Sequence, residues 1–224
     1  MAYYVTPETL DQKSKEWQAA IAPYNTHPME LNVENSALLV IDMQSFFLDP
    51  KSATFTEGGL AIIPRIQQLI AAFREAERPV IYAAHVHHPD RIDVGIMGWW
   101  WEGMCVEGTE EAKVHPALSP LPNEKVIYKH RYSAFYNTDL ETILRCLKVE
   151  DLVLTGIMTN LCCESTARDA YFRDYRLFFP SDATGSINEE LHLASLKNLA
   201  LGFAYVAETK AILEALQATH DSPR

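Results

Sequence analysis

Cysteine and basic residues are both scarce in this chain. Its four cysteines, in 224 residues, have neither the spacing of a metal-binding knuckle nor that of a disulfide framework. The 19 Lys and Arg are outnumbered by 30 Asp and Glu, and the formal net charge of −11 argues against nucleic acid or an anionic membrane as partner. No apolar run reaches the roughly 18 residues of a membrane span. We therefore expect a small-molecule substrate, with no nucleic acid and no membrane as partner.

The N-terminus lacks the basic stretch and apolar run of a secretory signal. Since the cysteines form no disulfide framework either, we expect a reduced, cytoplasmic protein. A hydrophobic content of 48% allows one sizeable domain with a full core. We therefore divide the chain into an N-terminal helical extension, residues 1–30, and one main domain, residues 31–220.

Short apolar runs alternate with segments of helical periodicity along the chain. The runs are typical of strands buried on both faces of a parallel sheet, and they span residues 36–43, 79–86, 125–130, 151–157, 175–183 and 204–209. The helical segments are 8–20, 60–77, 138–149, 160–174, 188–202 and 210–219. This order predicts an α/β protein with a three-layer α/β/α, doubly wound fold and a six-stranded parallel sheet.

Three reactive residues lie at or just beyond the ends of predicted strands. Asp42 ends the first strand, Lys129 ends the third, and Cys162 follows the fourth. In open parallel sheets ligands bind beyond the carboxyl ends of the strands. We therefore predict that these three side chains meet in one site.

Two adjacent cysteines, Cys162 and Cys163, begin the helical segment 160–174. Cys162 lies in the first turn, where free N–H groups and the dipole favour an anion, and a nearby lysine would add to that effect. We expect a thiol pKa lowered by about two units, so that the thiolate is the major form. Cys163 lies about 100° further round and shares a face with Ala167 and Ala170, which predicts a core position. The alternative is that both are inert, buried thiols.

Three stretches of the chain resemble one known family. LLVIDMQ, YKHRYSAFYNTDL and TGIMTNLCCESTARDAYFRDYRLFFPSDAT resemble blocks of the isochorismatase-like cysteine hydrolase superfamily, in the family's order. The resemblance covers most of residues 36–215, within the main domain 31–220. It implies a three-layer fold around a six-stranded parallel sheet and a homo-oligomer, here a dimer or tetramer.

The resemblance also implies a catalytic triad of Asp42, Lys129 and Cys162. A non-proline cis peptide bond maps to Ile157–Met158, and the N–H groups of Met158 and Cys162 map to an oxyanion hole. In such a site Cys162 attacks an amide, carbamoyl or ureide carbonyl and forms a thioester, while Asp42 serves first as base and then as acid. No cofactor is needed.

The same family leaves a second activity open. Its true isochorismatases cleave a vinyl ether and commonly lack a cysteine at the nucleophile position, so Cys162 favours C–N hydrolysis. The segments EELHLASLKNLALGFAYV and PDRIDVGIMGWWWEG nevertheless resemble the isochorismatase branch. The ether hydrolase is therefore one alternative, and a non-catalytic oligomeric binding protein of the same fold is another.

Three histidines, His85, His87 and His88, lie at the end of the second predicted strand. The nicotinamidase branch of the family binds a metal through an Asp-x-His motif after the first strand, but here FFLDPKSATFTEGG has no histidine. We therefore expect hydrogen-bonded loop and strand-end histidines, and no metal.

Candidate substrate-binding residues come from the loops beyond the strand ends. Gln44 and Phe47 follow Asp42 and suit polar and apolar contacts. Arg131 could hold a substrate carboxylate or form a structural salt bridge. Three consecutive tryptophans, 99–101, cannot all face one core, so we expect one of them, taken as Trp100, to line the pocket, or else to form a subunit contact.

Overall fold

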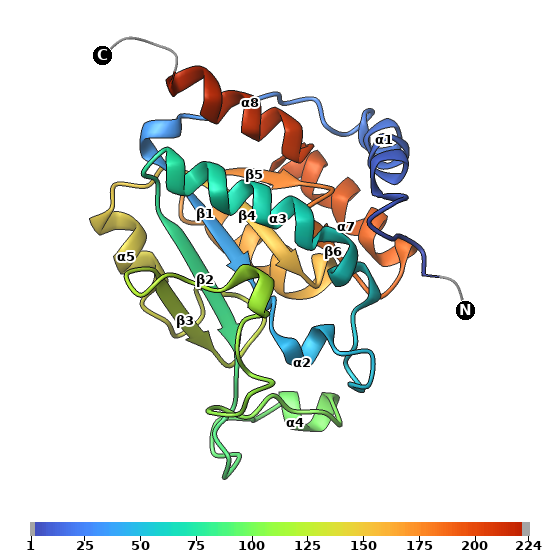
Figure 1. Ribbon diagram of the computed structural model, residues 1–224, viewed down its shortest axis with the longest axis vertical. Helices are drawn as coiled ribbons and strands as arrows, with labels where there is room; N and C mark the ends of the chain where they lie inside the picture. The colour runs from blue at the N-terminus through green and yellow to red at the C-terminus, as the bar shows by residue number, and fades with distance from the viewer. Residues whose placement is uncertain (1–2, 221–224) are drawn as a thin grey trace.

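The computed structural model describes residues 3–220. In this range seven strands form one wholly parallel sheet in the order β3-β2-β1-β4-β5-β7, with β6 beside β4 (Figure 1). The strands are β1 (Ser36–Ile41), β2 (Val80–His85), β3 (Lys125–Lys129), β4 (Asp151–Ile157), β5 (Arg176–Pro180), β6 (Thr184–Gly185) and β7 (Tyr205–Ala207). The predicted parallel α/β architecture is confirmed.

The predicted number of six strands is wrong by one. The apolar run 175–183 was read as one strand, but the chain turns after Pro180 and continues as the two-residue strand β6. The turn brings the Ala183 carbonyl to the Gly156 N–H at 2.9 Å, which moves the chain from the side of β5 to that of β4. A turn inside a continuous apolar run leaves no trace in its periodicity.

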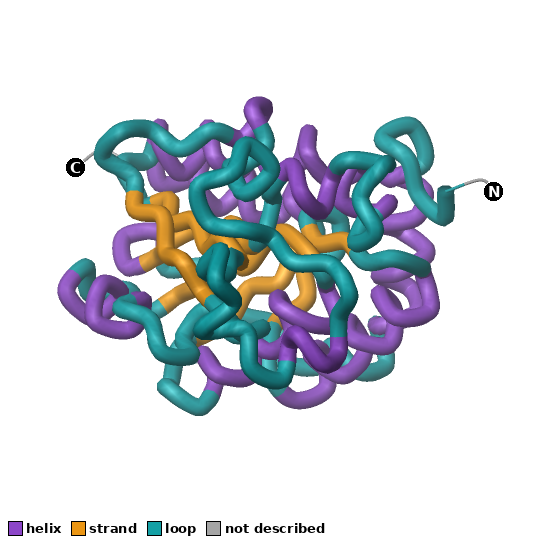
Figure 2. Tube along the Cα trace, turned by 90° about the horizontal axis from the view of Figure 1, so that it is seen from below, coloured by secondary structure: helices purple, strands orange, loops and turns teal. Residues whose placement is uncertain are grey.

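Helices cover both faces of the sheet, as Figure 2 shows with strands between two sets of helices. One face is covered by α3 (Glu57–Glu75) and α8 (Thr209–His220), most of whose buried apolar side chains belong to one hydrophobic cluster. The opposite cluster takes most of its helical residues from α1 (Leu10–Ile21), α5 (Leu140–Cys146), α6 (Glu164–Tyr171) and α7 (Glu189–Gly202). The three predicted layers are therefore present.

The side chains of β1 pack into both hydrophobic clusters. Its side chains alternate in direction, so that Leu38 and Val40 join the cluster under α3 while Leu39 and Ile41 join the other. Each such side chain contributes about 1.5–3 kcal/mol when fully buried. Burial on both faces explains why the strand reads as a continuous apolar run.

The N-terminal helix α1 is packed into the main core. Trp17 is 1% exposed, lies in the same hydrophobic cluster as α7, and donates its indole N–H to Glu189 at 2.8 Å. The segment before residue 31 thus shares its hydrophobic core with the main domain.

Two short helices were not predicted, α2 (Ser45–Leu48) and α4 (Met97–Trp100). Each is a single turn, too short to produce a periodic pattern. In Figure 1 both lie beyond the ends of the strand arrows, where the active site was expected. Short 3₁₀ turns lie at Val33–Asn35 and Pro116–Leu118. No helix in the described part of the chain is long and apolar enough to cross a membrane.

Candidate active site

Asp42 follows β1 and turns out of the sheet. Its φ of 52° lies in the left-handed region, which aspartate tolerates better than most residues, and its N–H is held by the Ala83 carbonyl at 2.8 Å. The neighbouring strand passes so close that Gly156, at φ 112°, has no room for a Cβ, because that atom would collide with the Ile41 carbonyl. The carboxylate ends up buried at the carboxyl edge of the sheet.

Lys129 ends β3 with its side chain fully buried. Its ammonium nitrogen lies 2.8 Å from Asp42 Oδ2 and 3.3 Å from Cys162 Sγ. Two further acceptors surround it, the Arg131 carbonyl at 3.2 Å and His85 Nδ1 at 3.4 Å. A buried ammonium needs such partners for its three N–H groups, and Lys129 has them.

Cys162 lies in the first turn after β4, a π-helical turn spanning Thr159–Cys163. The preceding Ile157–Met158 peptide bond is cis, at the position implied by the family resemblance. Thr166 donates its hydroxyl to the Cys162 carbonyl at 2.6 Å and so ties the turn to α6. The structure therefore brings Asp42, Lys129 and Cys162 together.

Cys163 occupies a different environment from its neighbour. It is fully buried and shares a hydrophobic cluster with Ala167 and Ala170 of α6. This confirms the core position predicted from helical spacing. The pocket described below is lined by Cys162, and Cys163 is not among its lining residues.

The electrostatics of the three groups correct one expectation. Burial and the charge of Asp42 raise the pKa of the Cys162 thiol, and Lys129 only partly opposes them. Burial also raises the pKa of Asp42, again against Lys129. Burial disfavours the Lys129 charge, but Asp42 and Cys162 outweigh it and raise the pKa of the ammonium. The pKa of Cys162 is therefore shifted in the direction opposite to the one expected, which favours the thiol over the thiolate.

A chain of histidines runs from Lys129 toward the surface. The ammonium can only donate, so His85 Nδ1 accepts and His85 Nε2 carries the proton. His85 Nε2 lies 3.0 Å from His87 Nε2, which then accepts, leaving His87 Nδ1 to donate to Asp93 at 3.2 Å. Burial lowers the pKa of both rings, in agreement with these neutral tautomers.

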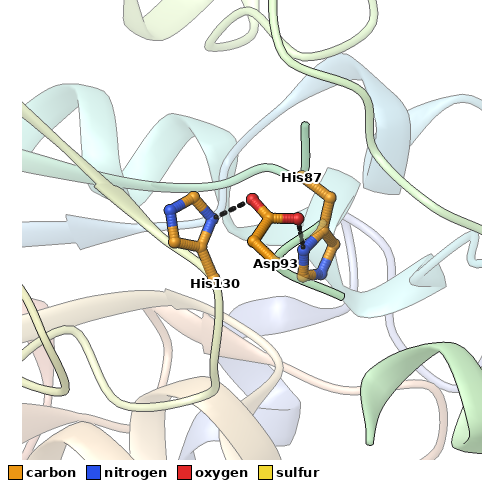
Figure 3. A group of neighbouring side chains, drawn as sticks. All are labelled: His87, Asp93 and His130. Carbon is orange, nitrogen blue, oxygen red and sulfur yellow. Dashed lines mark hydrogen bonds and ion pairs between the residues drawn. The ribbon is translucent and has the colours of Figure 1, made fainter. Parts of the chain in front are cut away.

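The outer end of this chain is a cluster of His87, Asp93 and His130 (Figure 3). Their ligand-type atoms lie within 4.8 Å of one another, and these residue types can bind a metal. In this arrangement both histidines direct Nδ1 toward Asp93, and His130 Nδ1 also donates to the Val86 carbonyl at 2.6 Å. These nitrogens carry protons, which a metal would have to displace. His85, His87 and His88 each take part in a hydrogen bond, as predicted for the histidines at the end of the second strand, whereas no role was predicted for His130.

A pocket opens onto two of the three reactive groups, Asp42 and Cys162. Its volume is about 60 Å³, several times the roughly 10–15 Å³ that one water molecule needs on the same measure. Aromatic and aliphatic side chains dominate its wall, including Phe46, Phe47, Val94, Met97, Trp101, Met104, Tyr132 and Leu161. The polar groups on its wall include Asp42, His85, His87, Arg91 and Cys162. Such a cavity suits a small, partly apolar molecule with a few polar groups.

Of the four predicted substrate-binding residues, only Phe47 lines this pocket. Gln44 is fully buried and clamps the ends of two strands: its amide accepts from the His85 N–H at 2.7 Å and donates to the carbonyls of His85 and Ala112. Arg131 donates to the carbonyls of Asp93, at 3.0 Å, and His130, at 2.6 Å. The side chains of Gln44 and Arg131 thus bind backbone groups, and neither residue lines the pocket.

Trp100 is also outside the pocket. It ends α4 and is 63% exposed, as is its neighbour Trp99 at 75%. Trp101 adopts an extended conformation after the helix, lines the pocket and donates its indole N–H to Tyr132 at 2.9 Å. The end of a four-residue helix decides which tryptophan turns inward, and the sequence did not predict that helix.

Several residues of the site were not predicted, among them His85, Arg91 and Tyr132. His85 pairs in register with Lys129 across β2 and β3, so strand alignment could have placed it there. Arg91 and Tyr132 line the pocket from loops whose course depends on distant contacts, and no local pattern marks them.

Comparison with known proteins finds a matching family model and several relatives. The family model "Isochorismatase domain" matches residues 36–211. Nicotinamidase 3 of Arabidopsis thaliana is 35% identical over 196 residues, covering 86% of this chain and 94% of that protein. A ureidoacrylate amidohydrolase of Methylobacterium radiotolerans is 32% identical over 226 residues, covering 91% and 88%. A solved cysteine hydrolase of Pseudomonas syringae pv. phaseolicola superposes with a TM-score of 0.83 at 29% identity, covering 86% and 99%.

Proposed function

We propose that this chain, which belongs to the isochorismatase-like family of hydrolases, cleaves a C–N bond of a small amide, carbamoyl or ureide substrate through a thioester on Cys162. The observation that carries the proposal is the contact of one buried ammonium, Lys129, with both the Cys162 sulfur at 3.3 Å and the Asp42 carboxylate at 2.8 Å. The names of two relatives, a nicotinamidase and a ureidoacrylate amidohydrolase, support the same class of reaction.

The first half of the proposed reaction forms the thioester. As Cys162 Sγ attacks the carbonyl carbon, its proton passes to Asp42, whose raised pKa makes it a stronger base than an ordinary aspartate. Lys129 stabilises the negative charge on sulfur. The N–H groups of Met158 and Cys162 stabilise the oxyanion, at about 3 kcal/mol for each donor. Asp42 then gives its proton to the leaving nitrogen, and the C–N bond breaks.

The second half hydrolyses the thioester. Asp42, ionised again, takes a proton from water as the water oxygen attacks the same carbon. The C–S bond breaks, and the proton returns from Asp42 to the Cys162 sulfur. The products are an acid and ammonia or a small amine, and the resting thiol is restored. No cofactor enters these steps.

The test is ammonia release from primary amides, carbamoyl amino acids and ureides by the wild type, Cys162→Ala and Cys163→Ala. Loss of turnover in Cys162→Ala alone supports the proposal, provided that thermal denaturation finds both variants folded. Cys163→Ala is the matched control, because it removes the adjacent sulfur that packs in the core. Turnover that survives in Cys162→Ala would contradict covalent catalysis.

Two alternatives have separate outcomes in the same experiment. A vinyl ether hydrolase that uses Asp42 and Lys129 would convert isochorismate, release no ammonia and keep its activity in Cys162→Ala. A non-catalytic binding protein would turn over neither class of substrate, although it would still bind ligands in the pocket.

We further propose a homo-oligomer, a dimer or tetramer, in the cytoplasm. The exposed rings of Trp99 and Trp100 support self-association, because aromatic side chains are enriched at protein interfaces. The free thiols of all four cysteines are compatible with a reducing compartment. Sedimentation of the wild type and of Trp99→Ser/Trp100→Ser measures the oligomer, and a wild-type monomer at micromolar concentration would refute it.

A further inference from the structure

One arginine of this protein differs from all the others in the described range. Residues 3–220 contain nine arginines, and eight of them donate to a carboxylate or a backbone carbonyl: Arg65, Arg74, Arg78, Arg131, Arg145, Arg168, Arg173 and Arg176. The guanidinium of Arg91 has no hydrogen-bond or ion-pair partner among these residues. It lines the pocket that contains Asp42 and Cys162.

The pocket wall has a glycine beside this guanidinium. A Cβ at Gly98 in α4 would first collide with the Val94 side chain and would also stand 3.1 Å from a guanidinium nitrogen of Arg91. The absence of a side chain at Gly98 therefore leaves space for both Val94 and Arg91 on the pocket wall.

The loop that carries Arg91 is anchored on both sides of it. The Arg91 N–H donates to the His88 carbonyl at 2.9 Å. Two residues on, the Asp93 carboxylate accepts from the His88 N–H at 3.0 Å and contacts His87 and His130, the cluster drawn in Figure 3. Arg131 binds the Asp93 carbonyl at 3.0 Å. The loop is thus organised before any ligand arrives, which reduces the entropy lost on binding.

The charges around the pocket indicate which kind of ligand Arg91 attracts. The protein has a formal net charge of −11, which disfavours the approach of an anion. The buried charge of Lys129 is already paired with Asp42. Arg91 is therefore an exposed positive charge on the pocket wall that no protein group pairs with, and a guanidinium matches a carboxylate through two parallel hydrogen bonds.

We infer that Arg91 binds a carboxylate of the substrate, so that the substrates are amides or ureides of small carboxylic acids, such as ureido acids and half-amides of dicarboxylic acids. This inference rests on the proposed function, since it places the scissile C–N bond at Cys162 and the carboxylate at Arg91. It also replaces the expectation of such a role for Arg131, whose Nη1 donates to two backbone carbonyls and which does not line the pocket.

Matched substrate pairs test the inference. Succinamate and butyramide share an amide and a chain length, and differ in a carboxylate against a methyl group. 3-Ureidopropanoate and N-propylurea form the corresponding ureide pair. Each is assayed with the wild type, Arg91→Gln, Arg91→Lys and the control Arg145→Gln, which alters an exposed arginine on α5.

We expect Arg91→Gln to lower kcat/KM for the carboxylates by about 10- to 100-fold, mainly through KM, as for loss of a charged hydrogen-bond pair. The neutral partners should change by less than about threefold, which is within ordinary context dependence. Arg91→Lys should keep part of the preference because the charge remains. An equal loss on both members of a pair, or no loss on the carboxylate, would overturn the inference.

Failure of the proposed function would be visible separately. If the wild type turns over no member of either pair, C–N hydrolysis of these classes is refuted, and calorimetric binding of succinamate and butyramide then tests Arg91 directly. A preference for succinamate that disappears in Arg91→Gln supports the carboxylate site. Equal or undetectable binding of the two compounds to the wild type would refute it.

Discussion

The buried ion pair between Lys129 and Asp42 makes the active site a point of weakness in the fold. Replacing Lys129 by methionine keeps most of the side-chain volume and removes the charge. Asp42 is then left at 2% exposure without its cation. Breaking a buried pair in this way typically costs about 3–5 kcal/mol, because one charge remains uncompensated.

The magnitude for Lys129→Met follows from the ability of Asp42 to take up a proton. An unfolded aspartate has a pKa of about 3.9, which is about 3.1 units below pH 7. Keeping the folded carboxyl protonated at pH 7 therefore lowers the free energy of unfolding by roughly 1.36 kcal/mol for each of these units. The upper limit is therefore about 4 kcal/mol at pH 7. This is a large fraction of the 5–15 kcal/mol by which domains are typically stable.

The pH dependence of Lys129→Met has a definite sign. Removal of the cation raises the folded pKa of Asp42 further above its unfolded value. At pH values between the unfolded and the folded pKa, the folded state therefore holds one more proton than the unfolded state. The free energy of unfolding then falls as the pH rises, by about 1.4 kcal/mol per pH unit. The deficit relative to the wild type should thus nearly vanish near pH 4 and grow with pH through neutrality.

Urea denaturation between pH 4.5 and 7.5 measures this deficit, and measurements begin at low pH, where the variant is most stable. Asp42→Asn/Lys129→Met removes both charges and should be more stable than Lys129→Met at pH 7. The matched control is Lys125→Met on the same strand, where an exposed ion pair with Asp139 should be worth at most about 1 kcal/mol. A Lys129→Met deficit below about 1 kcal/mol, or one independent of pH, would refute the reasoning.

Two further predictions concern Cys162 and the strand beside it. The raised pKa of Cys162 predicts that its alkylation by iodoacetamide accelerates about tenfold per pH unit up to pH 9. Mass spectrometry of the Cys146→Ser variant, which lacks the exposed cysteine, measures the rate of this alkylation. A rate that stops rising below pH 8 would contradict a resting thiol. Gly156→Ala should cost at least about 2 kcal/mol of stability and lower kcat, because its Cβ collides with the Ile41 carbonyl beside the site. The control Gly202→Ala has open space and should be nearly neutral in urea denaturation, so an equal effect of the two substitutions would count against the collision.

The positions of the three reactive groups could be predicted from local sequence. Each lies at or just beyond the end of an apolar run, and parallel strands joined by right-handed crossovers bring their carboxyl ends to one edge. Helical spacing likewise separated Cys162 from Cys163, because a turn of helix is a local property. The family resemblance added the place of the cis peptide bond.

The surroundings of the site depended on contacts that no local pattern encodes. Gln44 has the composition of a ligand-binding residue, but His85 and Ala112 fold against its amide and use its donors and acceptor. Arg131 lost its expected role in the same way, since two backbone carbonyls lie within its reach. The sequence lists donors and acceptors, and only packing decides which of them remain free.

Charge states were decided by the same long-range packing. A helix start and a nearby lysine predicted a thiolate at Cys162, but burial and the charge of Asp42 outweigh them. Burial depends on which side chains from distant strands and loops close over the sulfur, and electrostatic energies change severalfold with it. The sequence by itself determined the architecture and which three groups meet at the candidate site. The tertiary structure decided their protonation, the pocket wall and the one pocket-lining arginine of the described chain whose guanidinium was left without a partner.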